Sequence, residues 1–408
     1  MLRRAITTAC CLVAAGTALG GCAPSPGTTG TGSARPTASA HTTATPTPKA
    51  TPTPAPPGPF AVVVTNNQRT GVAYEVMLIN DAGQIVAHTN AQLPTLQPNQ
   101  TLTLPLVSVS NSTAYFLEGN TSVDSLTPSG AVAAVMSIPD GSSAELAFAV
   151  SPDDQQIAIA EINEQSDVAN DTSKGYIEDL VGGGNQVSLW NNSGTYALRW
   201  PAGWDGSSLI DEVASGRCGG PACGGNSYHV VDPSTGDATA AVCQTPSSQP
   251  SWGTPNATIT SYSLEGLPTA AGTACFEYAD SFNAYGDDTE TTSLDSMSWG
   301  GASATFTQAQ NQYGGLEYNA CELSPDGSQM ACTSSSNNAL TLVSSNGTAT
   351  NTGRTYNGIL GWIDASHLLV EVDSGDLGVF DPATGVLTTL AVPQADQVEM
   401  VATLPGGL

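Results

Sequence analysis

Short runs of alternating apolar and polar residues recur through most of the chain, and turn sequences separate them. Two of these turns, residues 151–158 and 324–331, align without gaps as S-P-D-D-Q-Q-I-A and S-P-D-G-S-Q-M-A. Each follows an alternating apolar run, at 146–150 and 320–323, and precedes a second strand-like run. Proline fixes φ, aspartate accepts bonds from the following amides, and glycine tolerates positive φ. The pattern therefore predicts tight hairpins between neighbouring strands.

Related turns recur along the chain at a period of roughly 40–50 residues, which is typical of a repeat architecture. The segments 204–210 and 362–369 are variants of the same hairpin. A second class of turn is D-P-S-T-G at 232–236 and D-P-A-T-G at 381–385, with looser forms at 80–83, 127–130, 191–194 and 344–347. The first class predicts the inner hairpin of a four-stranded unit, and the second class predicts its outer hairpin.

The S-P-D-G hairpin resembles the one in TolB-like and WD40-like β-propeller repeats. The resemblance implies an all-β fold, with a single propeller of four-stranded blades over residues 59–408. Seven blades fit if the irregular stretch 250–310 is one blade with a long insertion; six or eight blades and a β-sandwich array are alternatives. The strands at 60–65 and 72–79 lack an inner partner, and a spare strand at 397–403 is expected to complete that blade and close the ring.

The N-terminus has the order of an export signal. Basic residues precede a short apolar stretch, which is too short to span a bilayer because a span needs roughly 20 residues. Leu19-Gly20-Gly21-Cys22 resembles the lipobox of bacterial lipoproteins. The resemblance implies a signal peptide over 1–21, cleavage before Cys22, and lipid (diacylglycerol, palmitate) on that cysteine. An ordinary signal peptide with a chance cysteine is the alternative.

Residues 22–58 are almost entirely Ala, Gly, Pro, Ser and Thr, and this composition cannot bury a core. We expect a disordered tether that holds the folded part away from the extracytoplasmic side of the cell membrane. The same composition favours a GC-rich source such as an actinobacterium. The formal net charge of −27 repels phosphate backbones, so nucleic acid is not expected as a partner.

Six cysteines remain after the signal and Cys22, and an even number in an exported chain predicts disulfide bonds. Cys321 and Cys332 flank the 324–327 turn and their midpoint falls between Asp326 and Gly327, so they should face each other on paired strands. The other four are Cys218, Cys223, Cys243 and Cys275. Pairing Cys218 with Cys223 is the local option and leaves Cys243 with Cys275, although the sequence does not fix this choice. The spacings lack the close pairs of a zinc site.

One acidic cluster lies in the irregular stretch: Asp280, Asp287, Asp288 and Glu290, with Asp295 close by. Carboxylates on a loop can bind Ca²⁺, so a cation site or a partner-contacting loop is possible here; a solvated acidic loop is the alternative. Five nearby aromatic residues make this insertion the expected contact surface: Phe276, Tyr278, Phe282, Tyr285 and Trp299.

The sequence carries no recognisable catalytic motif. It lacks a G-x-S-x-G elbow and a G-x-G-x-x-G followed by a helix, and its four histidines do not have metal-ligand spacing. No catalytic residue, metal or cofactor is therefore expected, with Ca²⁺ as the one alternative. The sequence favours a non-catalytic module that binds an envelope protein or a cell-wall polymer. The alternative is an exported glycan hydrolase or lyase that uses carboxylates from different blades at the central channel.

Overall fold

The computed structural model describes residues 58–65, 72–95, 104–138, 144–194, 198–214, 227–246, 248–251, 254–283, 288–311, 318–372, 376–392 and 398–406. All of them belong to one compact unit, Thr53–Leu408. The signal peptide, Cys22 and nearly all of the spacer lie outside the described residues, as do Cys218, Cys223 and Asp287. The side chain of Asp288 is also outside the description.

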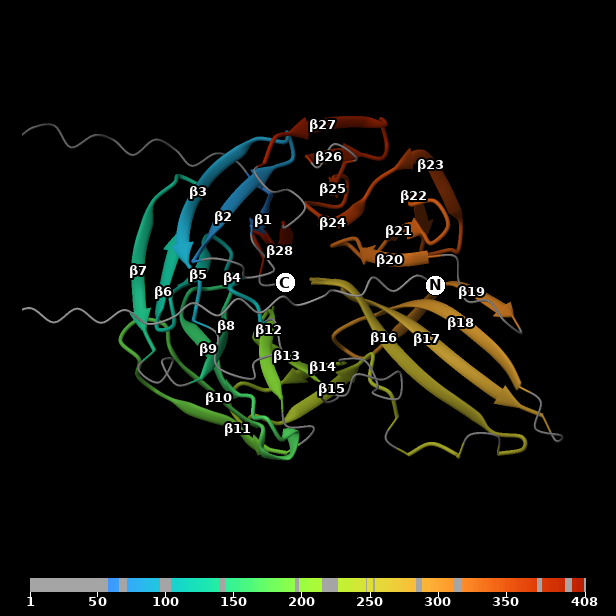
Figure 1. Ribbon diagram of the computed structural model, residues 1–408, viewed down its shortest axis with the longest axis horizontal. Helices are drawn as coiled ribbons and strands as arrows, with labels where there is room; N and C mark the ends of the chain where they lie inside the picture. The colour runs from blue at the N-terminus through green and yellow to red at the C-terminus, as the bar shows by residue number, and fades with distance from the viewer. Residues whose placement is uncertain are drawn as a thin grey trace, which may run out of the picture. The chain divides into compact units, whose positions relative to one another are not determined.

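The unit is a β-propeller of seven four-stranded antiparallel sheets arranged as blades in a ring (Figure 1). The all-β prediction and the prediction of seven blades are confirmed. Blades 1 to 3 consist of β28 (Glu399–Leu404), β1 (Phe60–Val64), β2 (Ala73–Asn80) and β3 (Ile85–Gln92); β4 (Val107–Val109), β5 (Ala114–Glu118), β6 (Ser122–Leu126) and β7 (Val132–Ser137); and β8 (Glu145–Val150), β9 (Gln156–Asn163), β10 (Thr172–Asp179) and β11 (Val187–Ser193).

Blades 4 to 7 follow the same order from the inner strand outward. They consist of β12 (Arg199–Asp205), β13 (Ser208–Val213), β14 (Ser227–Val231) and β15 (Ala238–Val242); β16 (Thr258–Thr269), β17 (Gly272–Phe282), β18 (Asp288–Met297) and β19 (Ser303–Asn311); β20 (Tyr318–Leu323), β21 (Gln329–Ser334), β22 (Ala339–Ser344) and β23 (Ala349–Thr355); and β24 (Gly358–Trp362), β25 (Leu368–Glu371), β26 (Leu377–Asp381) and β27 (Val386–Leu390). A 3₁₀ turn spans Val168–Asn170. Within the described residues, no helix is both long and apolar enough to cross a bilayer.

Blade 1 is built from both ends of the folded unit. Strand β28 supplies its inner strand and pairs with β1 from Phe60↔Leu404 to Val64↔Glu399. The expected closing strand near the C-terminus is therefore confirmed. Because β28 and β1 are far apart in sequence, their pairing joins the two ends of the folded unit and gives blade 1 its fourth strand.

The expected turns lie between the expected strands, with one exception. The inner hairpins at 151–158 and 324–331 join β8 to β9 and β20 to β21. The segment 191–194 is not an outer hairpin, because residues 191–193 belong to β11 and pair with 172–174 of β10. The turn of blade 3 lies just before β11, where Gly182 and Gly183 adopt φ of +91° and +62°.

Two disulfide bonds lie among the described cysteines. Cys321 and Cys332 are direct cross-strand partners on β20 and β21, and the structure joins them. The structure also joins Cys243, just after β15 of blade 4, to Cys275 on β17 of blade 5. The first bond lies within one blade, whereas the second connects two neighbouring blades.

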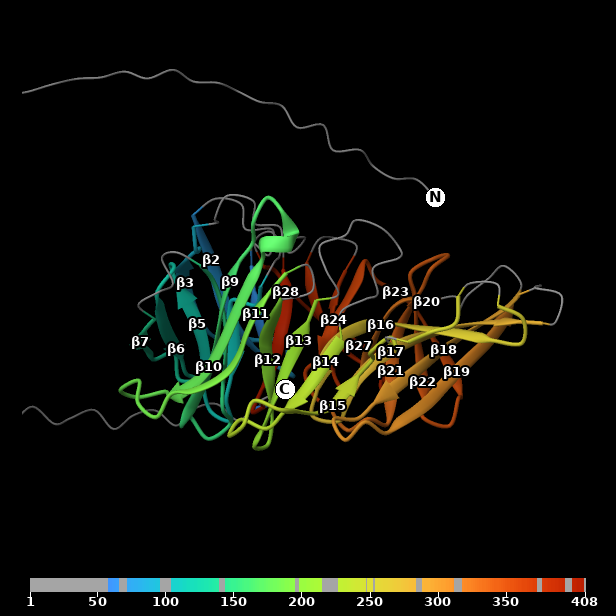
Figure 2. The same cartoon turned by 90° about the horizontal axis from the view of Figure 1, so that it is seen from below.

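Blade 5 has the longest strands of the propeller. Its four strands have 12, 11, 10 and 9 residues, whereas the strands of the other blades have 3 to 8. The expected long insertion in the stretch 250–310 is therefore wrong in form. The extra residues lengthen the strands themselves, and the far part of the sheet projects beyond the neighbouring blades (Figures 1 and 2). We call this far part, residues 258–262, 277–283, 288–293 and 306–311, the blade 5 extension.

Candidate functional site

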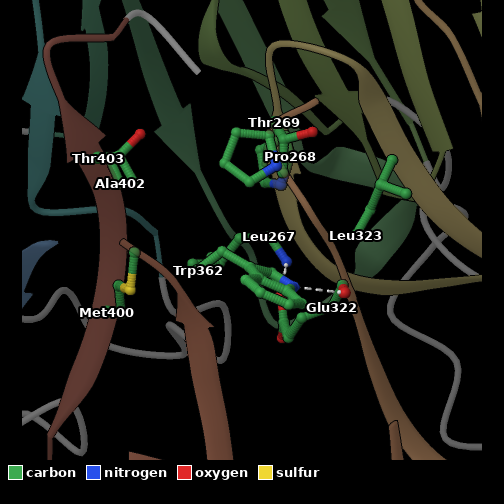
Figure 3. Close-up of a pocket in the computed structure, with 10 residues that line it drawn as sticks. Leu267, Pro268, Thr269, Glu322, Leu323, Trp362, Met400, Ala402 and Thr403 are labelled. Atoms are coloured by element: carbon green, nitrogen blue, oxygen red, sulfur yellow. Dashed lines mark hydrogen bonds between the residues drawn. The ribbon is translucent and has the colours of Figure 1, made fainter. Parts of the chain in front are cut away.

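A small pocket lies where inner strands of blades 5, 6, 7 and 1 approach one another (Figure 3). Its walls are mainly apolar and include Leu267, Leu323, Trp362 and Met400. Glu322 is the one ionisable residue among the ten that line it. The free volume of the pocket is about 20 Å³, which is enough for a water molecule or a group of a few atoms.

The carboxyl group of Glu322 is held by the backbone of the neighbouring blade. Strand β16 bulges after Glu265, and the amide of Leu267 donates a 2.8 Å hydrogen bond to Glu322 Oε2. Gly266, at φ +67°, makes this approach possible, because a Cβ there would lie 2.5 Å from both Glu322 Oε2 and the Cys321 carbonyl oxygen. The local fold of blade 5 is thus shaped around this side chain.

Burial controls the protonation of two carboxyl groups beside the pocket. It raises the pKa of Glu322 to about 8, against the opposing effect of the Leu267 amide and with a smaller contribution from Glu265. Burial likewise raises the pKa of Glu265 to about 7. At neutral pH, Glu322 is therefore mainly a neutral carboxylic acid, able to donate as well as accept a hydrogen bond.

Glu322 has a different side chain from the residue at the matching position of the other S-P-D repeat, although the backbone role of the two positions is the same. In the gapless alignment of the two S-P-D turns, Glu322 corresponds to Ala149, which is fully buried. Both residues offer their carbonyl oxygen to a tryptophan of the next blade: Trp204 Nε1 donates to Ala149 at 3.1 Å, and Trp362 Nε1 donates to Glu322 at 2.9 Å. The backbone role is shared, and only blade 6 adds a carboxyl group.

The described residues of the predicted acidic loop are distributed over two paired strands. Asp280 on β17 lies directly opposite Glu290 on β18, and Asp288 begins β18. Asp295 is buried further along β18, where the Ser293 hydroxyl donates a 2.9 Å bond to it. Among the described side chains, these carboxylates do not converge on a common point that could hold one cation. Ca²⁺ binding by Asp280, Asp287, Asp288 and Glu290 stays a prediction.

The expected aromatic contact surface is wrong for three of its residues. Phe276, Phe282 and Trp299 are buried in the propeller. Trp299 packs edge-on against Tyr228 at 5.7 Å and donates a hydrogen bond to the Thr269 carbonyl oxygen, so it joins blades 4 and 5. Tyr278 is half-buried, and Tyr285 lies outside the described residues. Proximity in sequence indicated exposure, but alternation along β17 turns Phe276 and Phe282 inward, and Trp299 is buried in the turn between β18 and β19.

The inner edge of the blade 5 extension is capped by side chains of the segment that precedes it. The side-chain amide of Gln249 bonds to both backbone groups of Thr260: it accepts a 2.6 Å bond from the Thr260 amide and donates to the Thr260 carbonyl oxygen. The Thr245 hydroxyl accepts a 3.0 Å bond from the Tyr262 amide. These contacts occupy backbone groups that would otherwise form an open strand edge.

Comparison with known proteins supplies no family for the chain. No family model matches it, and no curated protein matches it. Solved structures with a similar fold include an oligogalacturonate lyase in complex with manganese, at 11% identity and a TM-score of 0.44, over 79% of this chain and 84% of that one. TolB from Acinetobacter baumannii is 12% identical, with a TM-score of 0.37, over 84% of this chain and 65% of TolB.

A third similar structure is the Cps50 (Swd1) β-propeller domain of Myceliophteria thermophila. It is 12% identical, with a TM-score of 0.37, over 78% of this chain and 91% of that one. All three likenesses are too distant to transfer a ligand or an activity. The propeller class of this protein is defined by its own seven sheets.

Proposed function

We propose that the protein is a lipid-anchored, extracytoplasmic lipoprotein whose propeller binds an envelope protein or a cell-wall polymer without transforming it. The lipobox at Cys22 and the tether over 22–58, which has no acidic residue and only Arg35 and Lys49 as basic ones, support the anchor and its location. A tether of this composition keeps the folded unit away from the bilayer while leaving it free to reach a partner. Domain boundaries at 21 and 58 belong to the same proposal.

The blade 5 extension is the observation that carries the binding role. Ordering each residue of a strand costs roughly 1–2 kcal/mol of conformational entropy, which burial normally offsets. Most described side chains of the extension are only half-buried, and many are Thr, Ser, Asp or Glu, so they add little to the core. A projecting sheet with a capped inner edge is well suited to present a fixed polar surface to a partner.

The acidic pair on this surface gives a direct test. Asp280 and Glu290 are acidic residues that lie directly opposite each other on β17 and β18 of the blade 5 extension. The variant Asp280→Asn/Glu290→Gln keeps the shape and removes both charges. The matched control Asp205→Asn/Asp237→Asn removes two exposed charges from blade 4.

We expect crosslinking and affinity capture from the native envelope to recover one reproducible protein or polymer with the full wild-type chain. Capture should fall at least fivefold for the Asp280/Glu290 variant and remain unchanged for the blade 4 control. Equal capture by the two variants would contradict binding through the blade 5 extension. Recovery of a glycan that becomes shortened would contradict a non-catalytic role.

A second candidate function rests on Glu322 and Glu265. Glycoside hydrolysis uses one protonated and one ionised carboxyl group, and the raised pKa values of these two residues fit such a division. Against it, only Glu322 lines the pocket, and the space there is too small for a sugar ring. Incubation with purified envelope glycans tests this alternative, because product formation that is lost in Glu322→Gln would favour an enzyme.

A further inference from the structure

Two turns from the first and last blades bring three potential metal ligands together. Asp81 lies in the turn between β2 and β3 of blade 1, and Asp364 and His367 lie in the turn between β24 and β25 of blade 7. One ligand atom from each of the three residues lies within 4.8 Å of the other two. This is the seam at which the ring closes, since blade 1 contains both the first and the last strand of the propeller.

Close packing fixes the two blades beside this cluster. Gly83, in the same turn as Asp81, has φ of +74°, and a Cβ on it would lie 2.9 Å from Cγ2 of Thr388 on β27. The turn of blade 1 therefore lies directly against the outer strand of blade 7. The position of Asp81 follows from this contact and does not depend on a bond made by its own side chain.

An ordinary ion pair explains two of the three residues but not the third. His367 Nδ1 lies 2.9 Å from Asp364 Oδ2, and both side chains are about three-quarters buried. Asp364 Oδ1 accepts bonds from the amides of Ser366 and His367, which fixes the carboxylate in place. Asp81 is exposed and has no hydrogen-bond or ion-pair partner within the described part of the chain, although one of its carboxylate oxygens lies within 4.8 Å of an oxygen of Asp364.

The cluster carries more negative charge than one imidazole can balance. Asp81 and Asp364 each contribute one carboxylate to it, and His367 contributes one imidazole. One imidazolium would balance at most one of the two carboxylates, so a net negative charge would remain. A divalent cation between Asp81 and the Asp364–His367 pair would neutralise this excess.

We propose that Asp81, Asp364 and His367 form a metal site that bridges blades 1 and 7 and binds a divalent transition metal of the Zn²⁺ type. One imidazole nitrogen with carboxylate oxygens is a ligand set that suits such ions better than Ca²⁺ or Mg²⁺. Metal–ligand bonds of about 2.0–2.2 Å place adjacent ligands roughly 3 Å apart, which matches the 2.9 Å between His367 Nδ1 and Asp364 Oδ2.

The arrangement implies a stabilising role. A metal held by ligands from both sides of the seam would oppose separation of the first and last blades, which are otherwise joined by side-chain packing and by β28, the strand that follows blade 7 in the chain and pairs with β1. Three protein ligands leave further coordination positions for water. This inference is independent of the binding role proposed for blade 5.

The test compares zinc binding and thermal stability of the full chain after removal of metal with EDTA. Isothermal titration with Zn²⁺ should give one site per chain that depends on this cluster, and Zn²⁺ should raise the melting temperature. Asp81→Asn should weaken Zn²⁺ binding at least tenfold and abolish the Zn²⁺-dependent rise, while leaving the melting temperature in EDTA unchanged. That combination separates a metal ligand from a residue needed only for folding.

Two further variants complete the experiment. His367→Ala should also weaken zinc binding at least tenfold. His88→Ala is the matched control, because His88 pairs with Glu75 at 2.6 Å on the surface but is not grouped with a third ligand, and its loss should leave the site intact. The proposal is overturned if the chain does not bind Zn²⁺, or if Asp81→Asn and His367→Ala bind it as tightly as the His88→Ala control.

Discussion

The phenol of Tyr115 donates a 2.8 Å hydrogen bond to the carboxylate of Asp154, and this bond joins blade 2 to blade 3. Asp154 adopts φ of +60° at the position that Gly327 occupies, with φ of +68°, in the aligned turn of blade 6. Its second oxygen accepts a 3.1 Å bond from the Ser112 hydroxyl. Asp154 is therefore less favourable than glycine at this positive φ, but its side chain makes two hydrogen bonds between blades that glycine could not make.

We expect Asp154→Gly to lower the free energy of unfolding by about 1–3 kcal/mol. Glycine would relieve roughly 1 kcal/mol of backbone strain, but the variant loses two hydrogen bonds to a charged acceptor, each contributing about 1.5–3 kcal/mol before solvent exposure reduces it. Urea unfolding measures the difference. Tyr115→Phe removes one of the same bonds, so the double variant should lose less stability than the sum of the two. A variant more stable than the wild type would show that backbone strain outweighs the contacts.

The bulge that surrounds Glu322 predicts a large effect of a single methyl group. Gly266→Ala should destabilise the protein by about 1 kcal/mol through its positive φ, and by about 2 kcal/mol more through the clash with Glu322 and the Cys321 carbonyl oxygen. Gly301→Ala is the control, because Gly301 also has positive φ (+80°) but has open space around it. Chemical denaturation should separate the two; equal losses would mean that the close approach at Gly266 is unimportant.

The raised pKa of Glu322 predicts a specific pH dependence of stability. The pKa of its carboxyl group is about 8 in the folded protein against an ordinary value of 4.5, so the folded state binds the proton more tightly. The contribution of this group to stability is therefore present below about pH 4.5 and is lost as the pH rises towards 8. Glu322→Gln removes this titration and keeps an acceptor for the Leu267 amide. The stability of this variant relative to the wild type should therefore rise between pH 5 and pH 8.

Thermal melts across this pH range test the expectation, with Asp205→Asn as an exposed-carboxylate control. A difference between Glu322→Gln and the wild type that stays constant from pH 5 to pH 8 would contradict the assignment of a buried, protonated carboxyl group at this position. A decrease in the stability of Glu322→Gln relative to the wild type as the pH rises would also contradict this assignment.

The capped edge of blade 5 predicts a change in association. Gln249→Ala removes the side chain that bonds to both backbone groups of Thr260, so the edge of β16 becomes available to a second chain. Size-exclusion chromatography with light scattering should then show concentration-dependent dimers or larger species. Gln155→Ala, which removes an amide that bonds within its own turn, should behave as the wild type.

The sequence predicts the features of this protein that depend on short-range chemistry. The S-P-D and D-P-x-T-G turns mark hairpins because proline, aspartate and glycine act within a few residues, and their period predicts the blades. The exception at 191–194 has the same cause, since those turn-like residues are held in β11 by pairing with β10. The run of glycines at 182–184 was the stronger signal for the turn.

The candidate sites depend on contacts between distant parts of the chain, and this limits what the sequence can predict. The environment of Glu322 is created by Leu267, 55 residues earlier, and Asp81 meets His367 only because the ring closes. The one local signal for Glu322 was its difference from Ala149 in the repeat. Such a break in an otherwise consistent pattern is a reasonable place to look for function.

Photo-crosslinking from single positions in the native envelope tests the proposed binding surface most directly. A photoreactive residue at Thr289, exposed on β18 of the blade 5 extension, should yield a discrete adduct with one partner. The same residue at Thr235, exposed in the outer turn of blade 4, should not. Adducts that form equally from both positions, or only from Thr235, would contradict binding through blade 5.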